Sequence, residues 1–179
     1  MLYTKFIRLL FFLILTLQLL SSCSSKQPFC YDFETEDTID ALRWKCKTFF
    51  SLSNKHSISG QKSLKMELYP SSYPGITLKN FNPDWSKHTI LKFGIHNEEQ
   101  IPLRLNIRID DKKNPSYNNR YNNSIILKCG INHVSIPLNS LRTSGTDNKI
   151  DLTNVLKMVL FLSSPEEKRV VYLDNIRLE

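Results

Sequence analysis

The sequence predicts an all-β domain, a sandwich or a barrel. Short apolar or alternating segments follow one another at intervals of about ten residues, separated by turn residues, and no long amphipathic helix interrupts them. Each alternating strand has one apolar side that needs a partner sheet, which suggests two sheets packed face to face. The 179 residues, 41% of them hydrophobic, suffice for one domain with a substantial core, and two domains would be cramped.

The N-terminus has the pattern of an export signal. The chain starts with a short basic segment, and the apolar run at residues 9–20 is too short to cross a bilayer as a stable helix. Next, Leu20-Ser21-Ser22-Cys23 resembles the bacterial lipobox, in which small residues admit the lipoprotein signal peptidase and the cysteine is acylated. The resemblance implies a lipoprotein signal peptide at residues 1–22 and a lipidated tether at residues 23–28. The alternative is an ordinary secretory signal with an incidental cysteine.

The implied acylation of Cys23 places the protein at the cell envelope, with the lipid bilayer as its first partner. Two or more acyl chains, of the palmitate type, hold a protein on a membrane without a spanning helix. Ser24 follows Cys23, and in Gram-negative lipoproteins a residue other than Asp at that position implies sorting to the outer membrane.

The domain at residues 29–179 divides into strands at its turn residues. The breaks are rich in Pro, Gly, Asn, Asp and Ser, which favour turns. Strands are expected at residues 29–34, 42–50, 63–68, 75–78, 89–96, 103–110, 124–127, 132–137, 157–162 and 170–178. One helical turn is expected at residues 151–156, where Asp151 can cap the first turn.

Three of these strands alternate strictly between apolar and polar residues. In residues 63–68 and 89–96, every second side chain is apolar and the opposite side carries polar or small residues. Residues 103–110 place four aliphatic side chains on one face and a dense polar row on the other. That row consists of Arg104, Asn106, Arg108 and Asp110.

A polar loop follows this row. Asp110-Asp111 opens the loop, and Tyr117, Asn119, Arg120 and Tyr121 close it. Two interpretations remain open at this point. The strand and loop form either a ligand-reading surface or a solvated sheet face with its turn.

The order of the segments resembles the galactose-binding-like β-sandwich, or jelly roll, of many carbohydrate-binding modules. The resemblance covers nearly the whole chain after the tether and implies two antiparallel sheets. It rests on YDFE at residues 31–34, SISGQKSLKMEL at 57–68, YPGITL at 73–78, DWSKHTILKFGIHN at 84–97, PLRLNIRIDD at 102–111, YNNRYN at 117–122, CGINHVSIPL at 129–138 and YLDNIRL at 172–178.

Two positions depart from the pattern of related domains. Asn119-Arg120-Tyr121 stands where they often have Asp-Arg-Phe, and Cys129-Gly130 stands where they often have Pro-Gly. The first change removes a carboxylate beside Arg120, so a charge pair there is in doubt.

The resemblance also implies a structural calcium ion. In many modules of this fold, a Glu near the first strand, an Asp of the last strand and loop carbonyls hold such an ion. Here these residues are Glu34, Asp174 and the carbonyls near residues 60–62. Calcium takes six to eight oxygen ligands, which converging loops can supply. The alternative is that both carboxylates make ordinary hydrogen bonds at strand ends.

Sugar binding needs aromatic rings against the pyranose face and fork-shaped polar groups for its hydroxyls. Tyr73, Tyr117 and Tyr121 are the candidate rings, although Tyr121 also fits a core position. The candidate polar ligand-binding residues are Arg108, Asp110, Asp111, Asn119 and Arg120. An exposed pair between Arg108 and Asp110 is the alternative, and it would contribute little.

Three classes of function or site are disfavoured. Enzyme signatures such as GxSxG, HExxH and the P-loop are missing. The adjacent carboxylates Asp110-Asp111 do not readily face each other across a cleft, as a catalytic pair would. We therefore expect no enzyme. The net charge of +7 falls to +5 without Lys5 and Arg8 of the leader and is dispersed, which does not indicate nucleic acid. The cysteines lack zinc-site spacing.

After Cys23, three cysteines remain in an oxidising compartment. Cys30 and Cys46 pair if the first two strands are neighbours, in which case Cys129 is a buried free thiol; no disulfide at all is the equal alternative.

The sequence therefore predicts a membrane-anchored lipoprotein whose non-catalytic domain binds glycan or polysaccharide at the cell envelope. The main alternative is a scaffold for envelope proteins, which would be favoured if loops covered the polar row of residues 102–111. An enzyme acting on envelope glycan would need a cleft with two facing carboxylates.

Overall fold

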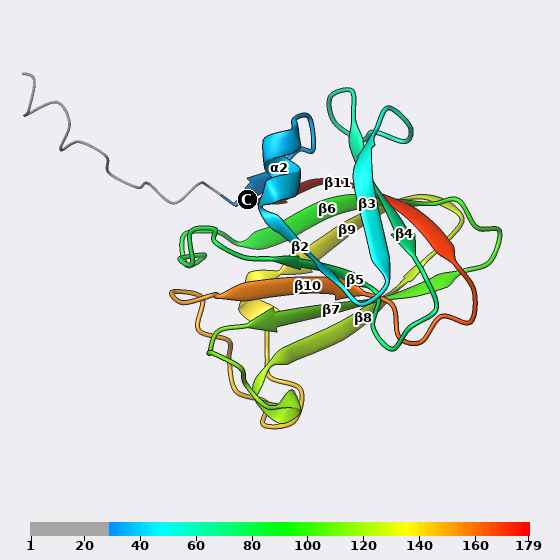
Figure 1. The fold of residues 1–179 in the computed structure, drawn as a ribbon. Coiled ribbons are helices and arrows are strands. Elements are labelled where there is room, and N and C mark those ends of the chain that lie inside the picture. The colour runs from blue at the N-terminus through cyan, green and yellow to red at the C-terminus, as the bar shows by residue number, and fades with distance from the viewer. Residues whose placement is uncertain (1–28) are drawn as a thin grey trace, which may run out of the picture.

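The computed structural model describes residues 29–179, apart from the side chains of Trp44 and Lys45. The predicted signal peptide, the tether and Cys23 lie outside the described residues. Residues 29–179 form two antiparallel sheets packed face to face, so the predicted all-β jelly-roll sandwich is confirmed (Figure 1). Within this range, none of the helices has the length and apolar character needed to cross a bilayer.

One sheet, which we call sheet A, contains six strands. Five follow the order β3-β4-β11-β6-β9, and the sixth, β1, pairs with β11. Its strands are β1 (Cys30–Tyr31), β3 (Thr48–Ser53), β4 (Ser63–Leu68), β6 (Ile90–Asn97), β9 (Gly130–Pro137) and β11 (Arg169–Leu178). The first and last strands of the chain are antiparallel neighbours, with Cys30 opposite Arg177.

The second sheet, sheet B, contains five strands in the order β2-β5-β10-β7-β8. Its strands are β2 (Leu42–Lys45), β5 (Gly75–Leu78), β7 (Leu103–Asp110), β8 (Tyr121–Leu127) and β10 (Lys157–Phe161). The central strand β10 comes late in the chain and lies between two earlier strands. Residues far apart in the sequence therefore become neighbours on one face.

The expected strand at residues 42–50 is in fact two strands that belong to different sheets. Cys46 has a positive φ of 52°, and the Thr48 N–H donates to the Cys46 carbonyl at 2.8 Å. This tight reversal sends β2 to sheet B and β3 to sheet A. The expected strand at residues 29–34 is also shorter, because only Cys30–Tyr31 pairs.

The helical turn expected at residues 151–156 was wrong. Asp151 instead accepts hydrogen bonds from the Thr153 N–H and hydroxyl at 2.9 and 2.6 Å, which closes a local turn. The described chain forms three short helical segments elsewhere. They are α2 (Glu36–Asp40), η1 (Tyr117–Asn119) and η2 (Leu138–Ser140).

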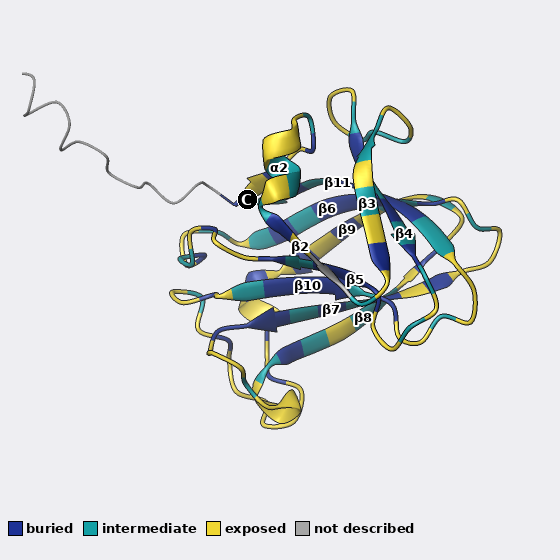
Figure 2. Ribbon diagram, in the orientation of Figure 1, coloured by how far each residue is buried: buried dark blue, intermediate teal, exposed yellow. Residues whose placement is uncertain are grey.

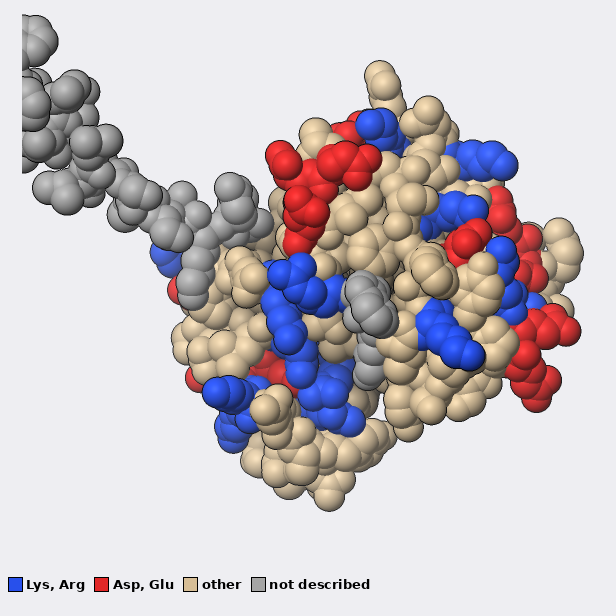
Figure 3. Space-filling view, in the orientation of Figure 1, with Lys and Arg blue, Asp and Glu red and all other residues tan. Residues whose placement is uncertain are grey.

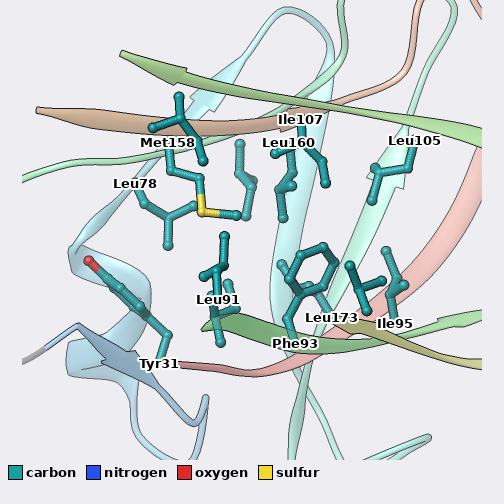
Figure 4. Close-up of a cluster of buried hydrophobic side chains, with 14 of the residues drawn as sticks. Tyr31, Leu78, Leu91, Phe93, Ile95, Leu105, Ile107, Met158, Leu160 and Leu173 are labelled. Carbon is teal, nitrogen blue, oxygen red and sulfur yellow. The ribbon is translucent and has the colours of Figure 1, made fainter. Parts of the chain in front are cut away.

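The core lies between the sheets and is formed within residues 29–179. The alternating strands turn their apolar sides inward, so that β6 and β11 of sheet A meet β7, β10 and β5 of sheet B (Figure 4). Trp85 is completely buried and Tyr121 is 7% exposed, so both are core residues. The loops and α2 are mostly exposed (Figure 2). Because residues 29–179 enclose a continuous core between two complete sheets, we expect this segment to fold as a domain.

The three cysteines of the described chain are free. Cys30 lies on β1 of sheet A and Cys46 in the turn after β2, and no disulfide joins them. Cys129 is exposed rather than buried, because it precedes the turn at Gly130.

Candidate functional site

A hollow of about 630 Å³ lies on the outer face of sheet B. Its floor comes from the polar sides of β7 and β8 and from the end of β10, and its walls come from the loops before β5 and β8. The four aliphatic side chains of β7 point into the core. Strict alternation therefore turns the polar row predicted from the sequence toward the hollow.

Strand register assembles the floor from three parts of the chain. One cross-strand row joins Phe161, Asn106 and Ser124, and the next joins Val159, Arg108 and Asn122. The two rows put amide, hydroxyl and guanidinium groups beside an aromatic ring.

Aromatic rings stand at two sides of the hollow. The Tyr73 ring packs edge-on against Phe161, with centroids 5.7 Å apart, and Tyr73 is 48% exposed. Tyr117, on η1, is 62% exposed, and the Arg120 guanidinium lies 5.4 Å from the centre of its ring. Large exposed rings beside polar groups provide the surface that a pyranose ring can stack on.

Arg108 is held in place by the carboxylate of Asp110, its neighbour on the same face of β7. Its Nε and Nη2 atoms donate to the two oxygens of Asp110 at 2.7 and 2.6 Å, and Lys157 Nζ lies 2.7 Å from one of them. The Asp110 side chain is only 1% exposed. The predicted Arg108–Asp110 pair is confirmed, but it is mostly buried rather than an exposed surface pair.

Arg120 has no carboxylate partner among the side chains that the structure describes. Its Nε atom is buried without a hydrogen-bond acceptor. Burial lowers the pKa of the Arg120 guanidinium, and the nearby charge of Arg108 lowers it further. Asn119, the residue before it, donates to Ser116 Oγ at 3.0 Å. Arg120 is therefore a half-buried cation without an anionic partner among the described side chains.

The structure brings together some of the predicted ligand-binding residues and separates others. Arg108, Tyr117 and Arg120 line the hollow, and Asp110 holds Arg108 in place. Asp111 is buried elsewhere, where its Oδ2 accepts the Asp151 N–H at 2.9 Å. Asn119 lies beside the hollow but does not line it.

Sequence reasoning missed the contributions of β8 and of the end of β10. Asn122, Ser124, Phe161 and Ser163 all line the hollow. The polar run Asn122-Asn123-Ser124 in β8 was a usable signal. The pairing of β10 with β7 could not be read from the sequence, because about fifty residues separate the two strands.

The two predicted calcium ligands lie at a shared loop. Glu34 Oε1 accepts the N–H groups of Gln61 and Lys62 at 2.9 and 3.0 Å, and Asp174 Oδ2 accepts those of Ile58 and Ser59 at 2.6 and 2.8 Å. Gly60, with a φ of +66°, lets the loop pass Glu34, because a Cβ there would lie 2.2 Å from Oε1.

Asp174 keeps one carboxylate oxygen unsatisfied. Its Oδ1 is buried and has no hydrogen-bond partner. Burial raises the pKa of this carboxyl, the loop amides oppose the rise, and the negative charge of Glu34 adds to it. An orphaned anionic oxygen beside a second carboxylate fits a cation. No group of three or more His, Cys, Asp or Glu able to hold a metal occurs within residues 29–179, so further ligands would be carbonyls or water.

A histidine pair on the outer face of sheet A was not expected from the sequence. The rings of His56 and His96 stack with centroids 3.6 Å apart, and His56 Nε2 lies 3.1 Å from Glu98 Oε1. Burial lowers the pKa of His96, and the charge of His56 lowers it further, while Glu98 opposes the shift. The two histidines are far apart in the chain, so no local pattern links them.

No protein-family model matches the sequence, and neither does any curated protein sequence. Similar folds occur among solved structures. An exo-β-agarase matches with a TM-score of 0.68 and 19% identity, over 86% of this chain but only 25% of its own. A family 11 carbohydrate-binding module from Clostridium thermocellum, in complex with a β-1,3-1,4-mixed-linked tetrasaccharide, has a TM-score of 0.59 and 16% identity, over 76% of this chain and 86% of its own.

A family 28 carbohydrate-binding module specific for non-crystalline cellulose matches with a TM-score of 0.53 and 16% identity. The match covers 83% of this chain and 92% of the module. At these identities the likeness concerns the fold, which is the β-sandwich of carbohydrate-binding modules. The chain spans about a quarter of the length of the agarase that it matches.

Proposed function

We propose that this β-sandwich, a fold shared with carbohydrate-binding modules, is a non-catalytic domain that binds polysaccharide in the hollow of sheet B. The observation that carries the proposal is the combination of exposed aromatic rings and polar groups that face the hollow. Tyr73 and Tyr117 flank a floor of amide, hydroxyl and guanidinium groups. Apolar ring faces and fork-shaped polar groups are the two things that sugar recognition needs.

The scaffold alternative is weaker because the polar row is not covered. It would be favoured if loops lay over residues 102–111. Instead Arg104 is exposed, and Asn106 and Arg108 line an open hollow. A protein partner remains the outcome to pursue if polysaccharides do not bind.

The test uses the soluble chain from Ser24 onward on a broad polysaccharide and glycan array, followed by calorimetry. Tyr73→Ala and Tyr117→Ala should each weaken binding at least about tenfold, which corresponds to about 1.4 kcal/mol. Phe49→Ala is the matched control, because Phe49 is 66% exposed on β3 of sheet A. Folded protein that binds no polysaccharide, or equal losses in all three variants, would refute the proposed site.

We also propose that acylated Cys23 anchors the domain to the cell envelope, at the outer membrane if the cell is Gram-negative. The support is the lipobox-like sequence that ends at this cysteine. The full chain should incorporate a labelled fatty acid and fractionate with membranes, and Cys23→Ser should abolish both. Membrane fractionation of Cys23→Ser at the parental level would argue against the anchor.

A structural calcium ion held by Glu34 and Asp174 completes the proposal. The support is the buried, unpartnered Oδ1 of Asp174. Such an ion supplies positive charge to both carboxylates and ties the loop at residues 57–62 to the last strand. Calcium at about a hundred times its dissociation constant should raise the melting temperature by about 5 °C or more. Asp174→Asn should lose that response, and equal melting of the parent in calcium and in chelator would exclude the ion.

A further inference from the structure

The hollow of sheet B carries more positive charge than its protein partners neutralise. Two cationic side chains, Arg108 and Arg120, line it. Two more, Arg104 on β7 and Lys157 on β10, contact residues of the same cluster, and the one carboxylate among the four is Asp110. Figure 3 shows Lys and Arg side chains gathered over β2, β10 and β7 with little acidic surface between them.

Asp110 is shared between Arg108 and Lys157, and it pairs with neither Arg104 nor Arg120 within the described residues. One of its oxygens accepts Arg108 Nε, and the other accepts Arg108 Nη2 and lies 2.7 Å from Lys157 Nζ. With one carboxylate between two cations, this cluster retains a net charge of +1. Its side chains are mostly buried, so water screens that charge poorly.

Arg104 and Arg120 lack an anionic partner among the described side chains. Arg104 Nη1 donates to the Ser124 hydroxyl at 3.0 Å, which leaves its charge uncompensated. Arg120 lies over the Tyr117 ring and keeps a buried Nε without an acceptor. A desolvated cation with unused N–H donors is stabilised most by an anion that accepts from it.

Two amides of the floor are already committed to the protein. Asn106 Nδ2 donates to the Phe161 carbonyl and to Ser163 Oγ at 3.3 and 3.1 Å. Asn122 Nδ2 donates to Ser144 Oγ at 3.1 Å. Arg120, in contrast, keeps its charge without an anionic partner among the described side chains.

We propose that the hollow selects anionic polysaccharides, whose carboxylate or sulfate groups are bound by Arg120 together with the Arg108 cluster, over neutral ones. This inference rests on the proposed function, because it names the class of polysaccharide for the same hollow. A guanidinium presents paired N–H groups that match the geometry of carboxylate and of oxyanions such as sulfate. The rings of Tyr73 and Tyr117 then hold the sugar that carries the anion.

The test compares polysaccharides that differ chiefly in charge. Polygalacturonate is paired with its methyl ester, which removes the carboxylate charge, and κ-carrageenan is paired with its chemically desulfated form. We expect at least about tenfold tighter binding to one or both anionic members, and the pair that shows it identifies carboxylate or sulfate. Poly-L-glutamate is a further arm, since it carries carboxylates without sugar.

Variants locate the effect within the hollow. Arg120→Gln should weaken binding of the anionic member at least about tenfold more than it weakens binding of the neutral member, because only the anion loses a charged partner. Arg177→Gln is the matched control: it removes the same charge from sheet A, where Arg177 pairs with Glu179 at 2.6 Å. Raising the ionic strength from about 0.05 to about 0.5 M should reduce the preference. Melting curves of both variants verify that they fold.

The outcomes separate this inference from the proposed function. Equal binding to both members of each pair would overturn the anionic selectivity and leave polysaccharide binding standing. Equal binding to poly-L-glutamate, or equal effects of Arg120→Gln and Arg177→Gln, would also overturn it by showing a general attraction to polyanions. Binding to no polysaccharide, neutral or charged, would refute the proposed function itself.

Discussion

Replacing Asp110 by Asn would remove the only carboxylate from a nearly dry cluster. The side chains of Asp110, Arg108 and Lys157 are 1%, 15% and 18% exposed, so the two cations would repel each other with little water between them. Removing one partner of a buried ion pair costs about 3–5 kcal/mol, and the partial exposure of the cations favours the lower end, about 3 kcal/mol. For a domain of this size, that corresponds to a melting temperature lower by about 6–12 °C.

Urea unfolding followed by the fluorescence of the buried Trp85 measures this loss in Asp110→Asn. The matched control is Asp147→Asn, because Asp147 is 84% exposed and lies 3.6 Å from Arg142. Its free energy of unfolding should stay within about 0.5 kcal/mol of the parent. A loss below about 1 kcal/mol for Asp110→Asn would refute the reasoning, since it would make this cluster equivalent to a surface pair.

Three further outcomes follow from other parts of the molecule. Gly60→Ala should cost about 1 kcal/mol, because its φ of +66° is strained for a residue with a Cβ and the new Cβ would displace the Glu34 carboxylate from the Gln61 and Lys62 amides; an unchanged urea midpoint would contradict this. The lowered pKa of His96 means that the unfolded chain binds more protons, so stability should fall as the pH drops below about 6.5 toward the folded pKa. His96→Gln should flatten that decline in melts between pH 7.5 and 5, and an identical decline would exclude His96 as its source. The three cysteines of the described chain should titrate with Ellman's reagent without reductant, whereas a loss of two thiols would reveal a disulfide.

Strands with a strict local period were predictable from the sequence. The expected strands at residues 63–68, 75–78 and 103–110 coincide with β4, β5 and β7, because alternation or clear turn residues fix both ends. The β2–β3 reversal was not predictable, because its positive φ falls on Cys46 rather than on Gly or Asn. The short helix α2 has no buried residue and thus no amphipathic pattern to detect.

The site was predictable only where one segment supplies it. Arg108, Tyr117 and Arg120 come from a single strand and its loop, so their common location could be inferred from the sequence. Phe161 reaches the same hollow only through the pairing of β10 with β7, which is a property of the whole sheet. Asp111 shows the opposite case. It follows Asp110 directly but lies beyond the end of β7, and its carboxylate accepts a hydrogen bond from the Asp151 amide.

The antiparallel pairing of β1 with β11 determines how the domain can be displayed in an experiment. Cys30 lies opposite Arg177, and the C-terminus lies beside β1 (Figure 1). A sensor chip that captures the protein by a C-terminal tag therefore attaches it at the end of β11, next to β1 of sheet A. The hollow lies on the other sheet, so capture at this position does not cover it.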